Sequence, residues 1–257
     1  MLNFRNTNIF FSALLVLLIW GNIRYGLPVY IYPLLLIMYS LIVFYGCYYI
    51  GSNFFLNVFC SAETDRKEIS ISFDDGPAAS YTPEILELLK QHDIKAAFFC
   101  IGKNIASNEK ILRQIRDDGH LLGNHSYSHH YWFDMYSSKK MIEDLKHMDA
   151  EMKRVTGLQP KLFRPPYGVI NPNLKKAIIN GNYTPVGWNV RSLDTVIKEE
   201  NKLLERINKG IKPGAVFLFH DTSKTTLAVL PAFLEEVKNK GYTIMPLDKL
   251  LHLTPYA

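Results

Sequence analysis

Charged residues are almost absent from the first sixty positions of this 257-residue chain, and this feature most restricts how it can fold. Residues 1–60 contain no Asp, Glu or Lys, and only Arg5 and Arg24 carry a side-chain charge. Leu27–Ile50 is uncharged throughout, and as a helix it would be about 36 Å long. That length is enough to cross the ~30 Å hydrocarbon core of a bilayer. We therefore predict a membrane anchor in residues 1–60 and a separate domain in residues 61–257.

The number of membrane spans is open among three interpretations. Ile9–Trp20 is apolar but short, so it reaches spanning length only with its polar neighbours. We expect two helices, about 8–24 and 27–50, that form a hairpin. The first alternative is a single span, with Ile9–Trp20 lying in the membrane interface. The second is a cleaved signal peptide, although no Ala-x-Ala-like site follows Trp20.

Beyond Cys60, strand-like apolar runs alternate with amphipathic helical runs. The expected strands are 69–73, 96–101, 121–124, 162–163, 183–190, 215–219 and 242–245. The expected helices are 83–92, 109–118, 138–156, 173–180, 202–209 and 227–240. Strands that alternate with helices predict parallel βαβ units in an α/β fold. Periodicity alone does not separate a closed barrel from an open sheet.

Two neighbouring carboxylates and two histidines offer the ligands of a metal site. Asp74 and Asp75 follow the expected strand 69–73, and His125 and His129 are four residues apart. A helical turn at the histidines would let both imidazoles face one metal, with a carboxylate as third ligand and an open position for water. Adjacent side chains at an extended strand end point in opposite directions, so one Asp can bind the metal while the other acts as a base.

Simpler interpretations exist for each of these features. Asp-Asp-Gly-Pro is typical of a turn, and a single His-x-x-x-His is often a surface coincidence. His130 is an alternative ligand, but its five-residue spacing from His125 fits a shared helix face less well. Trp188 could belong to the core, and Asp194 could cap a helix.

Three further motifs place polar residues directly after apolar runs, where an α/β barrel gathers its chemistry. They are Phe163-Arg164-Pro165-Pro166-Tyr167-Gly168, the segment from Gly187 and Trp188 to Asp194, and Val216-Phe217-Leu218-Phe219-His220-Asp221.

Together with Ser72-Phe73-Asp74-Asp75-Gly76-Pro77 and His125-Ser126-x-x-His129, these motifs resemble the polysaccharide deacetylase family, the NodB-homology carbohydrate esterases of family 4. They occur in the family's order and extend from Glu68 to about Leu251. The resemblance implies a distorted (β/α) barrel, commonly with seven units rather than eight, preceded here by the transmembrane helix or helices.

The resemblance also implies a role for each matching residue. Asp75, His125 and His129 would bind the metal. Asp74 would be the catalytic base, held in place by Arg164, and the backbone N–H of Tyr167 would stabilise the oxyanion. His220 would be the general acid, with Asp194 hydrogen-bonded to it and raising its pKa. The substrate pocket would be lined by Trp188, Pro166 and Leu218.

Two positions depart from the family pattern. Thr195 stands where many relatives have Trp, and Arg191 stands where an acid is often found. Both lie where the substrate groove is expected, so they bear on sugar preference and not on the metal site.

The resulting hypothesis is a metal-dependent hydrolase that removes N-acetyl groups from a polysaccharide containing N-acetylglucosamine, such as peptidoglycan or a chitin-like envelope glycan. O-deacetylation of a xylan-like or exported polysaccharide is the alternative, and a silent glycan-binding protein is a third. The two-His, one-Asp ligand set suits Zn²⁺, with Co²⁺, Ni²⁺ or Mn²⁺ as substitutes.

The expected partners are a polysaccharide and a membrane. For residues 61–257, 27 basic against 24 acidic residues give a charge of +3, which makes no case for nucleic-acid binding. Arg24 favours a cytoplasmic hairpin loop, whereas Arg5 favours a cytoplasmic N-terminus, which would place the loop outside. An envelope substrate favours the former, with the catalytic domain outside the cytoplasm. The oligomeric state is left open.

Overall fold

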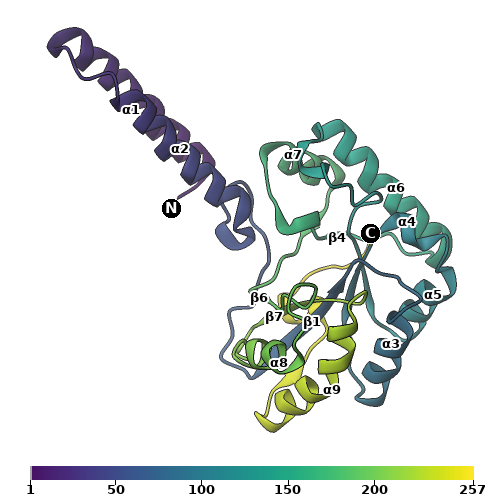
Figure 1. Ribbon diagram of the computed structural model, residues 1–257. Helices are drawn as coiled ribbons and strands as arrows, with labels where there is room; N and C mark the ends of the chain where they lie inside the picture. The colour runs from purple at the N-terminus through teal and green to yellow at the C-terminus, as the bar shows by residue number, and fades with distance from the viewer. Residues whose placement is uncertain (1) are drawn as a thin grey trace.

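The computed structural model describes residues 2–257, and in this part of the chain the strands form one eight-stranded sheet (Figure 1). The strands are β1 (Glu68–Asp74), β2 (Ala97–Cys100), β3 (Leu121–Asn124), β4 (Leu162–Phe163), β5 (Thr184–Pro185), β6 (Val190–Arg191), β7 (Val216–His220) and β8 (Thr243–Ile244). Their pairings are parallel, in the order β5-β4-β3-β2-β1-β7-β6, and β8 pairs with the beginning of β1.

The sheet curls into a half-barrel whose two ends are β5 and β6. An extended segment at 59–61 lies at the gap between these ends. The Phe59 N–H donates to the Pro185 carbonyl (3.1 Å), and the Gly187 N–H donates to the Phe59 carbonyl (2.9 Å). Ser61 forms an antiparallel bridge with Ala215, at the start of β7. The predicted distorted (β/α) barrel, with seven parallel strands around the curl, is confirmed.

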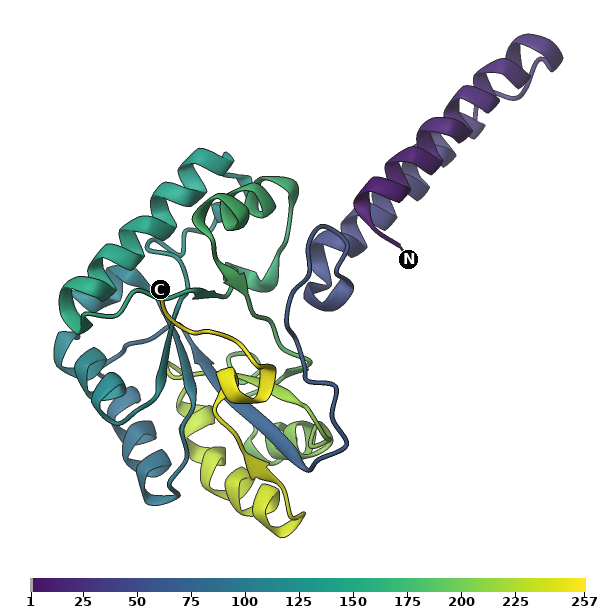
Figure 2. The same cartoon turned by 180° about the vertical axis from the view of Figure 1, so that it is seen from behind.

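Helices return the chain between strands and cover the outer face of the sheet (Figure 2). They are α3 (Thr82–Gln91), α4 (Gly102–Ile105), α5 (Glu109–Asp117), α6 (Ser138–Thr156), α7 (Pro172–Gly181), α8 (Glu200–Asn208), α9 (Lys224–Asn239) and α10 (Leu247–Leu251), with short 3-10 turns η1 (Ile50–Ser52), η2 (Phe133–Met135) and η3 (Pro166–Gly168). Each helix expected in the domain is present, with its ends shifted by at most three residues.

The expected single strand 183–190 is wrong. The chain forms two short strands here, because β5 pairs with β4 at one end of the sheet and β6 pairs with β7 at the other. Between them, the Val186 N–H donates to the Phe163 carbonyl and the Gly187 N–H to the Phe59 carbonyl. One uninterrupted strand could not pair with both ends of a curled sheet, so the chain bends as it crosses the gap.

Strand β1 joins the core to the site. Its alternate residues Ile69, Ile71 and Phe73 belong to the apolar cluster beneath the helices. The side chains of Ser72 and Asp74 point to the opposite face, inside the half-barrel, and both are buried. A strand buried on both faces is expected in a parallel sheet, but here the inner face is polar because it carries Ser72 and Asp74.

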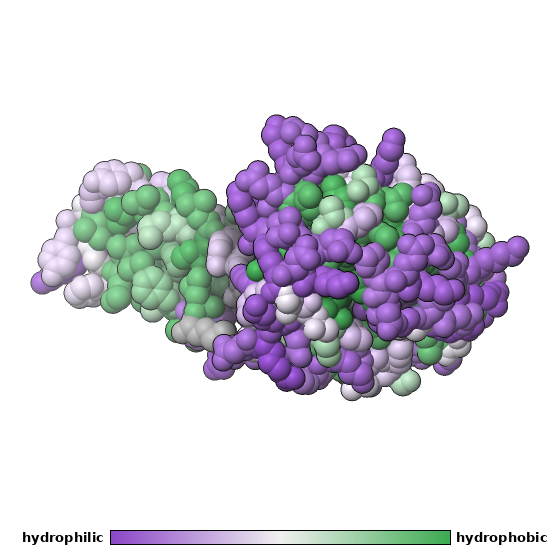
Figure 3. All heavy atoms as spheres, turned by 90° about the horizontal axis from the view of Figure 1, so that it is seen from below, coloured by the Kyte–Doolittle hydropathy of each residue, from purple (hydrophilic) through white to green (hydrophobic). Residues whose placement is uncertain are grey.

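Helices α1 (Phe4–Tyr25) and α2 (Ile31–Tyr48) project from the domain as a hairpin with an apolar surface (Figure 3). Both are long and apolar enough to cross a bilayer. Only 17% and 6% of their most apolar windows is buried, so they are not core helices of the domain. The first begins earlier than expected, because the Asn3 side chain accepts from the Asn6 N–H at its start. Met1, the first residue of the predicted anchor, lies outside the described residues.

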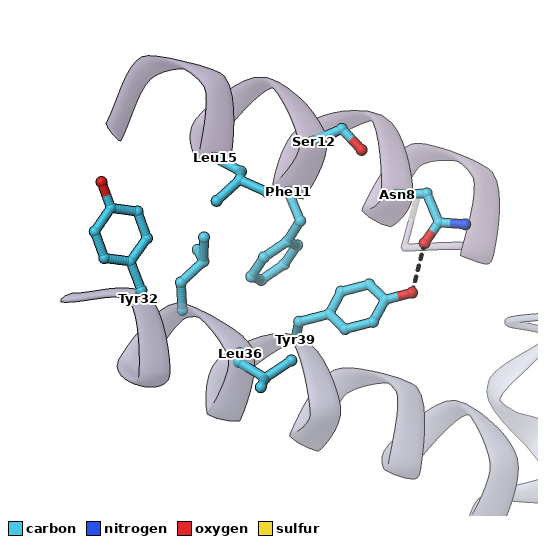
Figure 4. A pocket seen from close by; sticks show the side chains of 8 residues that line it. Asn8, Phe11, Ser12, Leu15, Tyr32, Leu36 and Tyr39 are labelled. Atoms are coloured by element: carbon cyan, nitrogen blue, oxygen red, sulfur yellow. Dashed lines mark hydrogen bonds between the residues drawn. The ribbon is translucent and has the colours of Figure 1, made fainter. Parts of the chain in front are cut away.

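The two hairpin helices touch through a few polar and aromatic contacts (Figure 4). The Tyr39 hydroxyl donates to Asn8 Oδ1 (2.8 Å), and the Tyr39 ring lies 5.3 Å from the Phe11 ring. Beside them a groove of about 320 Å³ remains, lined in part by Leu15 and Leu36. Most of the apolar surface of the hairpin therefore faces outward.

The base of the hairpin is bonded directly to the domain. The Ile170 N–H donates to the Cys47 carbonyl (3.0 Å), and the Phe4 N–H donates to the Phe54 carbonyl (2.9 Å). Beyond α2, residues 50–58 are packed against the half-barrel, in one apolar cluster with parts of η2, α6, β4 and α7. The hairpin is thus fixed to the domain without a free linker.

Candidate active site

The three predicted metal ligands come together at the carboxyl end of the sheet. Asp75 directly follows β1, His125 directly follows β3, and His129 lies on the next loop. Asp75 Oδ1 is 3.6 Å from His125 Nε2 and 3.5 Å from His129 Nε2. Within residues 2–257 this trio is the cluster of His, Cys and carboxylate groups able to hold a metal ion.

These separations fit a shared metal ion better than hydrogen bonds. N–H···O bonds have lengths of roughly 2.7–3.2 Å. Four ligands at ~2.1 Å in a tetrahedral arrangement would lie ~3.4 Å from one another. Asp75 Oδ1 is also buried without a hydrogen-bond partner, which is rare for a polar atom. A divalent cation between the three atoms would satisfy it, so these residues fit the metal that the resemblance implies.

His130 is occupied elsewhere. Its Nδ1 accepts from the Trp132 N–H (3.0 Å), and its ring stacks on that of Tyr136 (5.6 Å between centroids). It does not belong to the ligand cluster.

The two histidines reach one point without the helical turn that we expected. The backbone is irregular here, with positive φ at Ser126 (64°) and His129 (41°). The Ser126 N–H donates to Asn124 Oδ1 (2.8 Å), and the His129 N–H donates to Ser126 Oγ (2.9 Å). The expectation was wrong because these side chains offer the backbone N–H groups an alternative to helical bonds.

Asp144 of α6 holds the same loop, and sequence reasoning missed it. Its Oδ1 accepts from the Tyr127 N–H (2.7 Å), and its Oδ2 accepts from the Ser128 N–H (3.2 Å). Asn124 is fixed in turn, because its Nδ2 donates to Asp149 Oδ1 (2.8 Å). No motif marks these acids, since they occur in a helix rich in charged residues.

The expectation of an extended chain at Asp74 and Asp75 is also wrong. Asp75 has φ 76°, so the chain turns sharply after the strand ends. Both carboxylates therefore approach His125, whose Nε2 is 3.8 Å from Asp74 Oδ2. The two acids still differ, because Asp74 is buried and Asp75 is partly exposed.

His125 is held in the tautomer that a metal ligand requires. Its Nδ1 lies 2.8 Å from the Arg164 carbonyl, which can only accept, so the proton is on Nδ1 and the Nε2 lone pair is free. Burial is the main reason that the pKa of His125 falls to about 3. The imidazole is therefore neutral at physiological pH.

Arg164 is buried inside the half-barrel and fixes one oxygen of Asp74. Its Nη1 donates to Asp74 Oδ1 (2.8 Å) and to Ser72 Oγ (2.8 Å), and its Nη2 donates to the Gly187 carbonyl (2.9 Å). Its guanidinium carbon lies 4.0 Å from the Phe99 ring centroid. Burial raises the pKa of Asp74, and the charge and hydrogen bond of Arg164 act against that rise.

His220 and Asp194 form a second ordered pair. His220 Nδ1 lies 2.7 Å from Asp194 Oδ1, and the His220 N–H donates to Asp194 Oδ2 (2.7 Å). The Thr226 hydroxyl also donates to Asp194. Burial alone would lower the pKa of His220, but the hydrogen bond and charge of Asp194 raise it to about 9. Asp194 caps no helix, since α8 begins only at Glu200.

The remaining predicted residues surround this centre. The Tyr167 ring lies 4.8 Å from that of His129, in an edge-on contact, and Tyr167 has φ 59°. Trp188 packs over Gly168, where a Cβ would come within 2.7 Å of the indole. Pro166 is buried in η3. Leu218 is buried and alternates along β7 with Phe217 and Phe219, which face the outer helices, so it points into the half-barrel.

Asp221 is a buried acid that sequence reasoning did not single out. Its Oδ2 accepts from the Thr82 hydroxyl (2.7 Å), and its Oδ1 has no partner. Burial raises its pKa to about 7. It packs so closely on Gly76 that a Cβ there would come within 2.0 Å of its Oδ2. In the sequence, only its position directly after His220 could have pointed to this buried acid near the site.

Comparison with known proteins gives a consistent set of relatives. A model of the polysaccharide deacetylase family matches residues 61–186. Peptidoglycan-N-acetylmuramic acid deacetylase PdaA of Bacillus subtilis is 30% identical over 216 residues, covering 82% of this chain and 78% of the relative. Peptidoglycan-N-acetylglucosamine deacetylase PgdA of Listeria monocytogenes is 32% identical over 185 residues, covering 72% of this chain. The chain spans only 39% of that longer protein.

Two solved structures are similar in fold. The Bc1960 peptidoglycan N-acetylglucosamine deacetylase is 28% identical, with a TM-score of 0.73, over 77% of this chain and 94% of its own. BA3943 of Bacillus anthracis, a family 4 pseudoenzyme, is 28% identical, with a TM-score of 0.71 for one mutant and 0.70 for the wild type, the latter over 75% of this chain and 68% of its own. The identity to PdaA over most of its length, with the matching family model, shows that the chain belongs to the polysaccharide deacetylase family.

Proposed function

We propose that this chain is a metal-dependent deacetylase that hydrolyses the N-acetyl group of an amino sugar, of the N-acetylglucosamine type, in a cell-envelope glycan. Family membership alone does not carry this proposal, because one relative is a pseudoenzyme. The observation that carries it is that the base candidate Asp74 and the acid candidate His220 both lie beside the candidate metal ligands Asp75, His125 and His129. Asp75 Oδ2 lies 4.0 Å from His220 Nε2, and Asp74 Oδ2 lies 3.8 Å from His125 Nε2.

Asp75, His125 and His129 would hold the metal. A bound divalent cation, which we propose to be Zn²⁺, would make hydroxide available near neutral pH and polarise the acetyl carbonyl. The ligand set suits Zn²⁺, although Co²⁺, Ni²⁺ or Mn²⁺ could substitute.

Asp74 would take the proton from the attacking water. Its Oδ1 is occupied by Arg164, which leaves Oδ2 facing the ligand cluster. The bond from the buried Arg164 guanidinium keeps the carboxylate from rotating, so Asp74 Oδ2 stays directed toward the ligand cluster. Burial raises the pKa of the carboxyl group and so strengthens it as a base, while the charge of Arg164 limits that rise.

His220 would give a proton to the leaving nitrogen. An amine is a poor leaving group unless it is protonated, so amide hydrolysis needs an acid on that side. Asp194 holds the imidazole by Nδ1, which leaves Nε2 directed toward the ligand cluster. The raised pKa keeps His220 charged at neutral pH, and this favours an amide over an ester substrate.

The remaining residues would bind the acetyl group and sugar. We propose that the Tyr167 backbone N–H donates to the oxygen that becomes negative during attack. Trp188, Pro166 and Leu218 would shape the acetyl pocket. Arg191 and Thr195 would contact the sugar beyond it. The Arg191 guanidinium carbon lies 5.9 Å from the Trp188 ring centroid, which supports this placement.

The hairpin would anchor the enzyme in the cytoplasmic membrane, with the domain outside. Tyrosines near both ends of the hairpin suit the two interfacial belts, and Tyr25, Tyr30, Tyr45, Tyr48 and Tyr49 are all exposed. Arg24, near the free end of the hairpin, favours a cytoplasmic loop. The fixed attachment of the other end then keeps the domain on the envelope side.

The test measures the acetate that the full chain, reconstituted in nanodiscs, releases from glycan substrates. Chitooligosaccharide, peptidoglycan and acetylxylan would be compared, each with and without a metal chelator. We expect chelator-sensitive release from one of the N-acetylated glycans. Acetate release from acetylxylan alone would show that the chain is an O-deacetylase and not an N-deacetylase. If no metal-loaded sample released acetate from any substrate, the chain would be inactive, like the pseudoenzyme relative.

A further inference from the structure

One side of the domain lies at the base of the hairpin, where the proposed membrane anchor ends. The Cys47 carbonyl, in the last turn of α2, accepts from Ile170, two residues before α7. The neighbouring Tyr45, Tyr48 and Tyr49 are exposed, as expected at headgroup depth. Figures 1 and 2 both show α7 and the beginning of α6 on the side of the domain that bears the hairpin.

This same side carries most of the exposed large apolar residues of the domain. Beyond residue 50, the described chain exposes six such side chains, and four belong to the segment around η2 or to α7. These four are Tyr131 (73% exposed), Trp132 (59%), Met135 (76%) and Ile179 (62%). Single exposed apolar side chains are normal on a soluble protein. Here Tyr131 and Trp132 are in ring contact (4.8 Å between centroids), and Met135 follows three residues later in the same segment.

Two hydrogen bonds join these two segments. Asn171 Nδ2 donates to the Asp134 carbonyl (2.7 Å), and Asn173 Nδ2 donates to the Tyr136 carbonyl (3.1 Å). These bonds join the beginning of α7 to η2 and the turn before α6. The two segments are therefore held relative to each other and, through the bond between Ile170 and Cys47, to the base of the hairpin.

Lysines surround the apolar side chains. Residues 131–140 together with α7 contain four lysines and a single acid, Asp134. The lysines are Lys139, Lys140, Lys175 and Lys176, and each is at least partly exposed. Aromatic residues among lysines are the composition by which proteins bind to the surface of a bilayer that contains anionic lipids.

We propose that this surface, formed by Tyr131, Trp132, Met135 and Ile179 with the four lysines, lies in the headgroup layer of the anionic bilayer that the hairpin spans. The inference rests on the membrane insertion proposed above. It adds a second attachment that sets the tilt of the domain. The loop carrying the surface begins directly after the ligand His129, whose ring contacts Tyr167. The opening of the site would then lie beside the headgroups, and its substrate would be the acetylated glycan nearest to the membrane.

The test uses tryptophan fluorescence of the full chain in nanodiscs that contain phosphatidylglycerol and lipids brominated near the headgroup. The chain has Trp20 in the hairpin, Trp132 on the surface and Trp188 in the site. The difference between W20F and W20F/W132F isolates the Trp132 emission. The difference between W132F and W20F/W132F isolates that of Trp20, which reports hairpin insertion independently. The control W20F/W132F/K90W adds a reporter at the exposed end of α3, at the amino end of the sheet.

We expect brominated lipids to reduce Trp132 emission about twofold, because interfacial side chains penetrate roughly 5–10 Å. The K90W reporter should be unaffected. Adding K139E/K176E to W20F should lessen the quenching of Trp132. Quenching of Trp20 without quenching of Trp132 would overturn the surface contact while leaving the anchor intact. Absence of quenching at both Trp20 and Trp132 would show that the hairpin does not insert into the bilayer. Trp132 quenching that K139E/K176E leaves unchanged would overturn the role of the lysines.

Discussion

Asp74 and Asp75 are neighbours in the chain, yet their surroundings give them different chemistry. Asp74 ends a strand that is buried on both faces, and a buried arginine holds one of its oxygens. Asp75 follows a sharp backbone turn and directs a partnerless oxygen between two imidazoles. The sequence motif predicted that the two acids lie together at the site, and the division between base and metal ligand stays a prediction. It could not predict the positive φ that turns Asp75, since a non-glycine residue adopts that region only when its surroundings require it.

Asp74→Asn should abolish turnover and retain the metal. An amide cannot accept the proton from water, so we expect kcat to fall at least ~100-fold. Metal content by atomic emission should equal that of the wild type. Near-normal kcat in this variant would show that another group is the base.

His125→Ala should lose both metal and activity, because one ligand of three is removed. His130→Ala is the matched control, since its imidazole lies on the same loop but outside the cluster. Metal affinity by competition with a chromophoric chelator measures both variants. Equal affinity of the two variants would remove His125 from the ligand set.

The alkaline limb of the pH–rate profile should depend on Asp194. The proposed general acid His220 would act only when protonated, so activity on an amide should fall as pH rises through its pKa of about 9. Asp194→Asn removes the charge that opposes burial, so the pKa of His220 should fall and the limb should move to lower pH. The profile for an activated acetate ester, whose leaving group needs little protonation, is the control. An unmoved limb for the amide would assign it to another group.

At the scale of elements, the sequence predicted regular structure well and irregular structure poorly. Periodic helices and buried strands were found near their expected positions, because repeated burial of one face determines them. The split strands β5 and β6 and the loop 125–129 were missed. Both depend on partners far along the chain, such as Phe59 for Gly187 and Asp144 for Tyr127. No local pattern records such partners.

Asp144→Ala should weaken metal binding without removing a ligand. The carboxylate accepts from two N–H groups of the loop between the histidines, so its loss should let the loop relax. Supporting groups of this kind typically contribute ~10- to 100-fold to metal affinity. Glu143→Ala, its exposed neighbour on α6, is the control. Chelator competition on both variants measures the effect, and equal affinities would limit Asp144 to a structural role elsewhere.

At the scale of the whole molecule, the hairpin and the domain pack against one apolar cluster. The predicted boundary at residue 61 stays a prediction, and the family model also begins there. Residues before it nevertheless pack deeply, since Ile50, Phe54, Phe55 and Val58 are each at most 5% exposed. Phe59 also bonds at the gap of the half-barrel. A boundary near residue 49 therefore agrees better with the packing.

Truncation should show where the folding unit begins. A chain of residues 61–257 loses the four buried side chains and the Phe59 bonds, and it should be less stable than residues 49–257 by on the order of 5 kcal/mol. Urea unfolding of both, followed by circular dichroism, measures the difference. Equal stability would show that residues 50–60 contribute only to the anchor.

The bond between Cys47 and Ile170 has a kinetic consequence. A domain on a long flexible tether samples a hemisphere above the membrane, so its encounter rate depends on the substrate concentration within that volume. If the hairpin spans the membrane as proposed, a domain fixed to it moves only by lateral diffusion. Its encounters then depend on the number of substrate chains per unit area of membrane. Such an enzyme would modify glycan in a thin layer at a constant height. The depth of that layer, rather than the affinity of the site, would limit which strands it can reach.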